Sequence, residues 1–95
     1  MKPVLWSRAA QSDFAEIDAY YRLREAAHAQ RVIERAVAAG QFLQSHPEAG
    51  EAIEESNLRK WRVADTPYIL LYRVTSRAIR ISRVVHAARD WRRFI

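Results

Sequence analysis

Residues 58–86 read LRKWRVADTPYILLYRVTSRAIRISRVVH, and this stretch decides the fold class. Residues 58–63 alternate between polar and apolar side chains, as a half-buried strand does. Residues 68–74 are aromatic, β-branched and almost wholly apolar, which is typical of a central strand covered on both faces. Residues 78–85 alternate again, with a break in phase that predicts a bulge near Arg83. Short polar turns separate the three segments, so we expect an antiparallel meander.

The N-terminal half predicts one short strand followed by a helix. Residues 3–6 form the strand, and Pro3 favours an edge position because proline cannot donate to a ladder. Ser7 is expected to cap a helix over residues 8–24. The apolar stripe of this helix consists of Ala10, Phe14, Ile17 and Tyr21, and its other faces are expected to hold Asp13, Glu16 and Asp18.

A second helix follows and should end near His46, because the residue before Pro47 disfavours helical backbone angles. Its stripe consists of Ala29, Ile33, Ala36, Gly40 and Leu43. Gly40 is expected to permit a close approach to the first helix. The predicted fold class is α+β, ordered β-α-α-β-β-β, with a helical hairpin packed on one face of a small antiparallel sheet. We expect residues 1–95 to form one domain.

The composition excludes several function classes. The chain has no cysteine, which excludes disulfides and thiol catalysis and favours a cytoplasmic location. Its longest strongly apolar run, residues 68–72, is far shorter than the roughly 20 residues of a membrane span. Two of the three histidines, His28 and His46, lie far apart on the helical hairpin, so we expect neither a metal nor another cofactor.

Positive charge is concentrated in the second half of the chain. The net charge is +5, yet residues 57–95 contain ten basic residues and only two acidic ones. Such asymmetry indicates an anionic partner, either a nucleic acid or an acidic protein segment. A solvated sheet surface explains the same charge equally well.

Several motifs resemble the RelE/ParE superfamily of bacterial type II toxins, and its ParE branch in particular. The most specific are PYILLYRV at residues 67–74, ISRVVH at 81–86 and ARDW at 88–91. Pro47 and Gly50 match a "P..G" loop of the same superfamily. The resemblance covers nearly the whole chain and implies the helical-hairpin fold described above.

The resemblance implies a toxin that a cognate antitoxin neutralises in a hetero-oligomer. A ParE-like member would inhibit DNA gyrase without cleavage chemistry and would be neutralised by a ParD-like antitoxin. A RelE-like member would be a ribosome-dependent endoribonuclease that cleaves messenger RNA. A third possibility is a non-toxic member that only binds its antitoxin. We expect no membrane contact and no direct sequence-specific DNA binding.

The endoribonuclease alternative would depend on His86, Arg89 and Arg73 as catalytic residues, since cleavage needs a base and cations around the phosphate. Ile69 stands where a cleaving relative would have a cation, and no tyrosine follows Tyr72. His86 is expected to be structural. Asp90 is expected to pair with Arg89 and pin the tail. These features favour the ParE branch and no catalytic residues.

Two binding surfaces are predicted. The target-binding residues are Arg59, Arg62, Arg73, Arg83, Arg89 and Trp91, because arginine holds carboxylates and phosphates with two parallel hydrogen bonds. Solvation or pairing with nearby acids such as Glu54 and Glu55 is the alternative for the strand arginines. The antitoxin-binding residues are Val4, Leu5, Trp6 and Tyr20, at the expected sheet edge and on the first helix.

Overall fold

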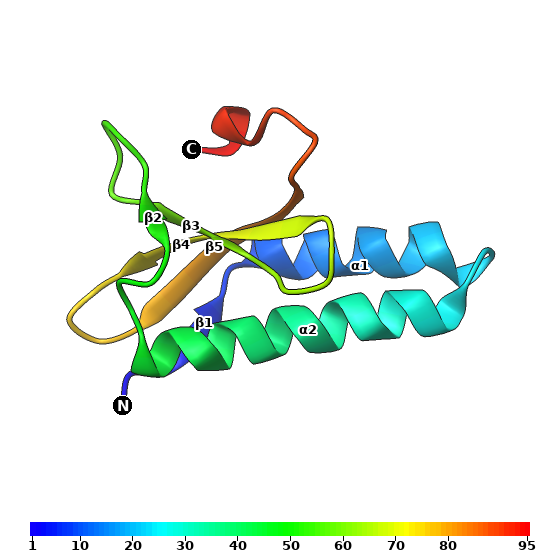
Figure 1. Ribbon diagram of the computed structural model, residues 1–95, viewed down its shortest axis with the longest axis horizontal. Coiled ribbons are helices and arrows are strands. Elements are labelled where there is room, and N and C mark those ends of the chain that lie inside the picture. The colour runs from blue at the N-terminus through cyan, green and yellow to red at the C-terminus, as the bar shows by residue number, and fades with distance from the viewer.

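The computed structural model describes residues 1–95 and consists of a helical hairpin packed on one face of a sheet (Figure 1). The strands are β1 (Val4–Trp6), β2 (Glu51–Ala52), β3 (Arg59–Arg62), β4 (Tyr68–Val74) and β5 (Ile79–His86). The helices are α1 (Arg8–Arg22), α2 (Ala26–Ser45) and the short 3₁₀ helix η1 (Trp91–Phe94). This architecture confirms the predicted α+β class. Neither long helix has the length and apolar content that a membrane span requires.

The sheet has the order β1-β5-β4-β3-β2, in which β1 is parallel to β5 and all other pairs are antiparallel. The first strand therefore lies at the border, as predicted. Leu71 faces Arg83 and Tyr72 faces Ile81, so Ser82 is the extra residue of a bulge. This places the bulge next to Arg83, where the change of alternation predicted it.

The sequence did not predict β2, which adds a fifth strand to the sheet. It has two residues, both exposed, and pairs with β3 through Glu51 opposite Lys60 and Ala52 opposite Arg59. A pair of exposed residues is too short to show an alternating pattern, so only the tertiary structure reveals it.

Ser7 connects the start of α1 to the sheet. Its Oγ accepts the N–H of Ala10 at 3.0 Å, which makes it the predicted N-cap. The same hydroxyl donates to the carbonyl of Ser82 at 2.7 Å. The beginning of α1 is thus held at the bulge of β5.

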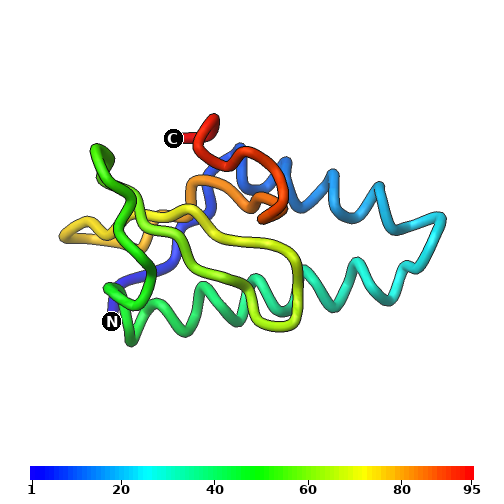
Figure 2. Tube along the Cα trace, turned by 45° about the horizontal axis from the view of Figure 1, so that its top comes forward, coloured from blue at the N-terminus to red at the C-terminus, as the bar shows by residue number.

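The two faces of β4 belong to two different layers of apolar side chains. Tyr68, Leu70 and Tyr72 pack with the helices. Ile69 and Leu71 point to the opposite face, where the C-terminal tail, including Trp91 and Phe94, covers them. Figure 2 shows the tail and α2 on opposite sides of the sheet. The expected central strand with two covered faces is confirmed.

Gly40 permits a close approach, but to β1 rather than to α1. A Cβ atom at this position would lie 2.9 Å from Cζ2 of Trp6 and 3.3 Å from Cγ1 of Val4. The expectation of contact with α1 was therefore wrong. The stripe of α2 is wide enough to face both α1 and the edge strand, and Gly40 lies on the part that faces the strand.

The loop that carries Pro47 and Gly50 is fixed by the phenol of Tyr72. The hydroxyl donates to the carbonyl of Pro47 at 2.8 Å and accepts the N–H of Gly50 at 2.9 Å. A Cβ atom on Gly50 would lie 2.6 Å from the Tyr72 ring, so only glycine fits here. Burial raises the pKa of the Tyr72 phenol, which keeps its proton available for this bond.

Candidate functional site

The face of the sheet opposite the helices, called the tail face below, carries several cationic side chains. The register pairs Arg62 with Ile69, Lys60 with Leu71 and Arg73 with Arg80, so these residues share one face. Trp91 from the tail covers part of this face, with the Lys60 Nζ 4.3 Å from its ring centre. Of the predicted target-binding residues, the tail face brings together Arg62, Arg73 and Trp91.

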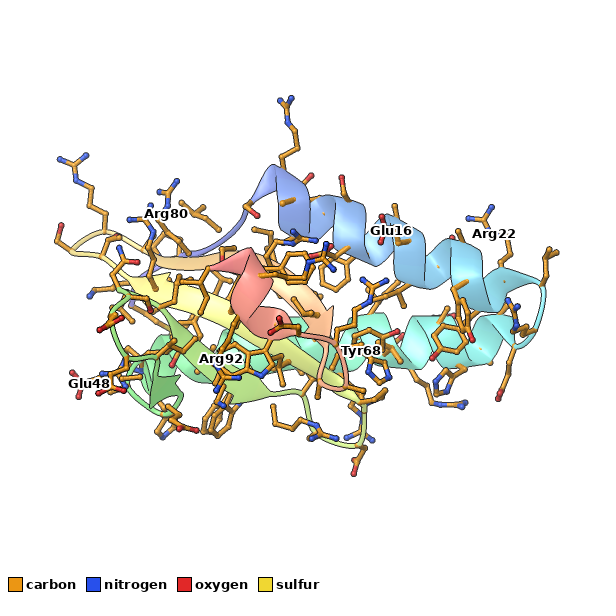
Figure 3. The ribbon with its side chains drawn as sticks, turned by 90° about the horizontal axis from the view of Figure 1, so that it is seen from above. Glu16, Arg22, Glu48, Tyr68, Arg80 and Arg92 are labelled. Atoms are coloured by element: carbon orange, nitrogen blue, oxygen red, sulfur yellow. The ribbon has the colours of Figure 1, made fainter.

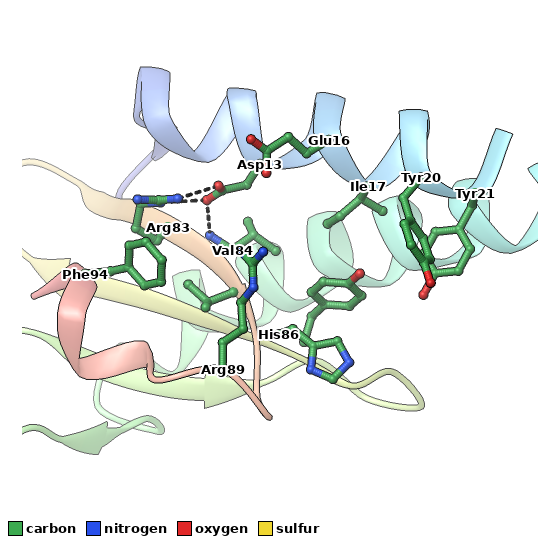
Figure 4. A pocket seen from close by; sticks show the side chains of 12 residues that line it. Asp13, Glu16, Ile17, Tyr20, Tyr21, Arg83, Val84, His86, Arg89 and Phe94 are labelled. Carbon is green, nitrogen blue, oxygen red and sulfur yellow. Dashed lines mark hydrogen bonds and ion pairs between the residues drawn. The ribbon is translucent and has the colours of Figure 1, made fainter.

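Arg83 is held by a carboxylate that the sequence pattern placed elsewhere. Its guanidinium donates to the two oxygens of Asp13 at 2.9 and 2.7 Å, and Asp13 also accepts the N–H of Val84 at 2.8 Å (Figure 4). Asp13 is only 6% exposed, which corrects the expectation that it occupies an outer face of α1. The hydrogen bonds that Arg83 donates to Asp13 raise the pKa of Arg83.

The position of Asp13 has a simple structural cause. The strand β1 ends at Trp6, which pairs with Ile81, so the edge of β5 beyond Ile81 has no strand beside it. The helix α1 passes along this open edge, and the Asp13 carboxylate accepts the Val84 N–H that a longer β1 would have bonded. The guanidinium of Arg83 then stacks on Phe94 of the tail at 4.2 Å.

Asp13 is the important residue that the sequence reasoning missed. It lies three residues after Ala10 and four before Ile17, so it has the spacing of the buried stripe. A charged residue at stripe spacing is a signal for a buried ion pair, because a lone buried charge is too costly.

Arg59 holds a loop rather than facing the tail. It pairs with Tyr72 in the register and therefore points to the helix side of the sheet. Its Nη1 donates to the carbonyl of Gly50 at 2.7 Å and to that of Glu48 at 3.3 Å. The Arg62 Nε also bonds a loop carbonyl, that of Thr66 at 2.9 Å, although most of its side chain stays exposed.

Arg89 lines a cavity of about 370 Å³ between α1, the end of β5 and the tail. Aromatic and polar side chains surround it, including Glu16, Tyr20, Tyr21, Tyr68 and His86 (Figure 4). The expected ion pair between Arg89 and Asp90 does not form, since no carboxylate oxygen lies within 4.0 Å of Arg89. Arg89 lines the cavity, whereas the adjacent Asp90 is the N-cap residue of η1 and does not line it.

Tyr68 lines this cavity and has a strongly raised pKa. Burial, together with the neighbouring Tyr21 phenol, raises the pKa of the Tyr68 phenol to about 12. The ring of His86 meets Tyr68 edge-on at 5.4 Å, and its Nδ1 accepts the N–H of Ala88 at 3.1 Å. In the neutral ring, this bond occupies the Nδ1 lone pair and leaves the hydrogen on Nε2.

The three residues of the endoribonuclease alternative do not converge in space. His86 and Arg89 share the cavity, but Arg73 is opposite Arg80, six strand residues from His86. At about 3.3 Å per residue, Arg80 and His86 are separated by about 20 Å along β5. The arrangement assembles no pair of acid and base around one phosphate position.

The predicted antitoxin-binding residues occupy two separate places. Val4 and Trp6 pack toward α2, while Leu5 between them is 44% exposed. Tyr20 is 55% exposed near the other end of α1, with the Arg24 guanidinium 4.4 Å from its ring centre.

The backbone of β1 is open along its outer side. The Pro3 carbonyl accepts the N–H of Ile79, and the Ser7 N–H donates to the Ile81 carbonyl, both at 2.9 Å. Because backbone groups alternate along a strand, those of Val4 and Trp6 point away from β5. The Gln11 side chain donates to the Trp6 carbonyl at 3.0 Å. The remaining outward groups can pair with an added strand.

Comparison with known proteins places these features in a family. A model described as the ParE toxin of the type II toxin-antitoxin system, parDE, matches residues 4–91. The chain is 33% identical over 90 residues to the Sinorhizobium fredii protein Y4kP, which is named as a toxin; the match covers 95% of this chain and 93% of that protein. A solved structure of the chromosomal ParDE system from P. aeruginosa has a TM-score of 0.79 and 24% identity, and the match covers 90% of this chain and 96% of that chain. The structural match shows a shared fold.

The family match extends from the edge strand through the helical hairpin and the meander to Trp91, and therefore includes nearly every element described above. The chain belongs to the ParE toxin family of type II toxin-antitoxin systems.

Proposed function

We propose that this toxin inhibits DNA gyrase by binding it and that a ParD-like antitoxin holds it inactive in a hetero-oligomer. The observation that carries the proposal is the match to the ParE model over residues 4–91. Inhibition by binding also agrees with the geometry of the cavity, where the Nδ1 of His86 is bonded to Ala88 and Arg73 is about 20 Å away.

The proposed gyrase-binding surface is the tail face with the adjoining rim of the cavity. Arg62 and Arg73 supply cations on the sheet, Arg89 supplies one at the cavity, and Trp91 supplies an aromatic anchor. Arg59 and Arg83 act differently, because their guanidiniums hold the Gly50 loop and Asp13. Their substitution would lower toxicity through loss of structure.

The proposed antitoxin surface runs from the edge of β1 to the far part of α1. Leu5 and Tyr20 are its most exposed members, and Val4 and Trp6 offer backbone groups for an added strand. Trp6 and Tyr20 are separated by about 20 Å along α1, so the antitoxin segment must be extended or helical over that distance. The structural neighbour is named as a ParDE system, which supports an antitoxin of the ParD kind.

The gyrase proposal is tested with purified toxin, gyrase and relaxed plasmid. The parent chain is expected to block supercoiling, and Arg62→Glu with Arg89→Glu is expected to abolish the block, because reversing cations at an interface can cost several kcal/mol. Arg22→Glu with Arg31→Glu, on the helical hairpin, changes the net charge equally and should inhibit like the parent. His86→Ala should also inhibit like the parent.

A parallel reaction with translating ribosomes separates the alternatives. We expect intact messenger RNA with every variant. Ribosome-dependent cleavage by the parent that His86→Ala abolishes, with gyrase unaffected, would refute the proposal and establish the endoribonuclease.

The antitoxin surface is tested by amide hydrogen exchange of the toxin with and without its antitoxin. Added protection is expected within residues 3–24, as strand addition and helix contact require. Unchanged exchange in this segment would refute the assignment.

A further inference from the structure

The β4–β5 hairpin has a charge pattern that the proposed function explains only in part, through Arg73 and Arg89. Residues 66–89 contain no aspartate or glutamate but five arginines. Asp13 neutralises Arg83 from α1, and Arg89 turns into the cavity. The other three are Arg73, Arg77 and Arg80, called the hairpin tip below, and no carboxylate oxygen lies within 4.0 Å of them.

Two of these arginines oppose each other directly. Arg73 of β4 pairs with Arg80 of β5 in the register, so their side chains leave the same face of the sheet side by side. Like charges in this position destabilise a sheet. A bound anion between the two guanidiniums would reverse that effect, since each can hold a phosphate with two parallel hydrogen bonds.

Beyond the side of Arg73 that borders the proposed gyrase surface, the hairpin tip offers no apolar anchor to a protein partner. Between residues 73 and 80, the exposed residues are the three arginines and Ser76. On the neighbouring strand β1, Leu5 lies opposite Arg80 and is the one exposed apolar residue of that strand. Protein interfaces draw most of their affinity from buried aromatic or apolar anchors, and the tip presents no such cluster.

The aromatic residues near the same face are already occupied. Trp91 stacks with Lys60 and Arg92, and Phe94 stacks with Arg83 and Arg93. Single-stranded nucleic acids are bound mainly by aromatic rings that stack on bases, whereas these rings already stack on protein cations and none lies on the hairpin tip itself. Cations without stacking rings suit the phosphates of a duplex.

We propose that the hairpin tip binds the phosphate backbone of duplex DNA without reading its sequence. This inference goes beyond the proposed function, because it requires neither gyrase nor the antitoxin. Affinity is expected to be that of non-specific binding, with a Kd on the order of 10⁻⁶ to 10⁻⁴ M at physiological salt.

The test is fluorescence anisotropy of a short labelled duplex of random sequence, titrated with the full-length toxin at several salt concentrations. The test variant carries Arg73→Gln, Arg77→Gln and Arg80→Gln. The control variant carries Arg8→Gln, Arg22→Gln and Arg31→Gln, which change the net charge by the same amount. Arg22 and Arg80 lie at opposite ends of the molecule (Figure 3). Circular dichroism verifies that both variants are folded.

The salt dependence gives the decisive readout. If each tip arginine neutralises one phosphate, the slope of log K against log salt should become shallower by about 2.7 in the test variant. The control variant should keep the slope of the parent, and a single strand of equal length should bind more weakly than the duplex. Equal weakening by both variants, binding that favours the single strand, or no duplex binding at low salt would overturn the inference.

The assay contains no gyrase, so its outcome is independent of the supercoiling experiment. A toxin that inhibits gyrase but binds no duplex would refute only the hairpin-tip inference. A toxin that binds duplex but leaves gyrase active would refute only the proposed function.

Discussion

Asp13 ties three parts of this molecule together through one carboxylate. It comes from α1, accepts the N–H of Val84 on β5 and holds Arg83, whose other side stacks on Phe94 of the tail. Because Asp13 is buried and Arg83 is partly buried, the pair is weakly screened by solvent. Replacing the Asp13 carboxylate by an amide leaves the Arg83 cation without its counter-ion and turns one of the two acceptor oxygens into a donor.

Asp13→Asn is therefore expected to lower the free energy of unfolding by about 3 kcal/mol. The measurement is urea unfolding at neutral pH. Asp18→Asn provides the control, because its ion pair with Arg22 is exposed and should contribute less than about 1 kcal/mol. Equal stability of Asp13→Asn and the parent would contradict the role assigned to this carboxylate.

Tyr68 should make the stability of the protein sensitive to high pH. Its phenol has a pKa of about 12 in the folded chain and 10.0 in the unfolded chain, because burial and the neighbouring Tyr21 phenol favour the neutral form. Between these values the folded state keeps a proton that the unfolded state loses, so stability falls as the pH rises from 10 to 12. Tyr68→Phe should show a smaller fall in urea unfolding over this range. Absorbance titration should show one late-ionising phenol fewer in this variant.

At the scale of elements, the sequence predicted the features that the local periodicity of apolar residues determines. The meander, both helices, the Ser7 cap and the bulge near Arg83 all follow from local spacing and turn chemistry. The two-residue β2 and the partner of Gly40 do not, since each depends on a contact between distant segments. The candidate site divides in the same way: the arginine-rich composition predicted a cationic surface, but the register between strands places Arg62 and Arg73 on one face and Arg59 on the other, where it holds the Gly50 loop.

The link between β4 and the loop after α2 is also such a distant contact, and Tyr72→Phe isolates it. The substitution keeps the buried ring but removes the hydroxyl that serves Pro47 and Gly50. Leaving a buried N–H without an acceptor and a carbonyl without its donor is expected to cost about 2 kcal/mol of unfolding free energy. Tyr20→Phe, at an exposed position, should change stability by less than about 0.5 kcal/mol. A Tyr72→Phe chain as stable as Tyr20→Phe would show that the loop is held by other contacts.

At the scale of the whole molecule, the sheet is covered by two very different layers. The helical hairpin covers one face with two long helices. The other face depends on the short tail, where Trp91 and Phe94 pack on a cluster with Ile69, Leu71 and Val85. The N–H of Ala87 donates to the carbonyl of Pro67, which ties the start of the tail to the sheet. The cations of Lys60 and Arg83 stack on the rings of Trp91 and Phe94, respectively. Two aromatic side chains therefore protect the centre of the sheet from water on this side.

Trp91→Ala combined with Phe94→Ala is expected to remove that protection. Because both rings are only partly buried, we expect a loss of about 2–4 kcal/mol in the free energy of unfolding, below the sum for two fully buried aromatics. The exposed cluster should also bind a hydrophobic dye such as ANS, while the far-ultraviolet circular dichroism of the helices remains. Arg92→Ala with Arg93→Ala leaves the rings in place and should cost about 1 kcal/mol or less. If the ring variant unfolds at the same urea concentration as the parent and binds no dye, the tail does not cover the sheet in solution. The tail face would then be accessible as a whole to the target.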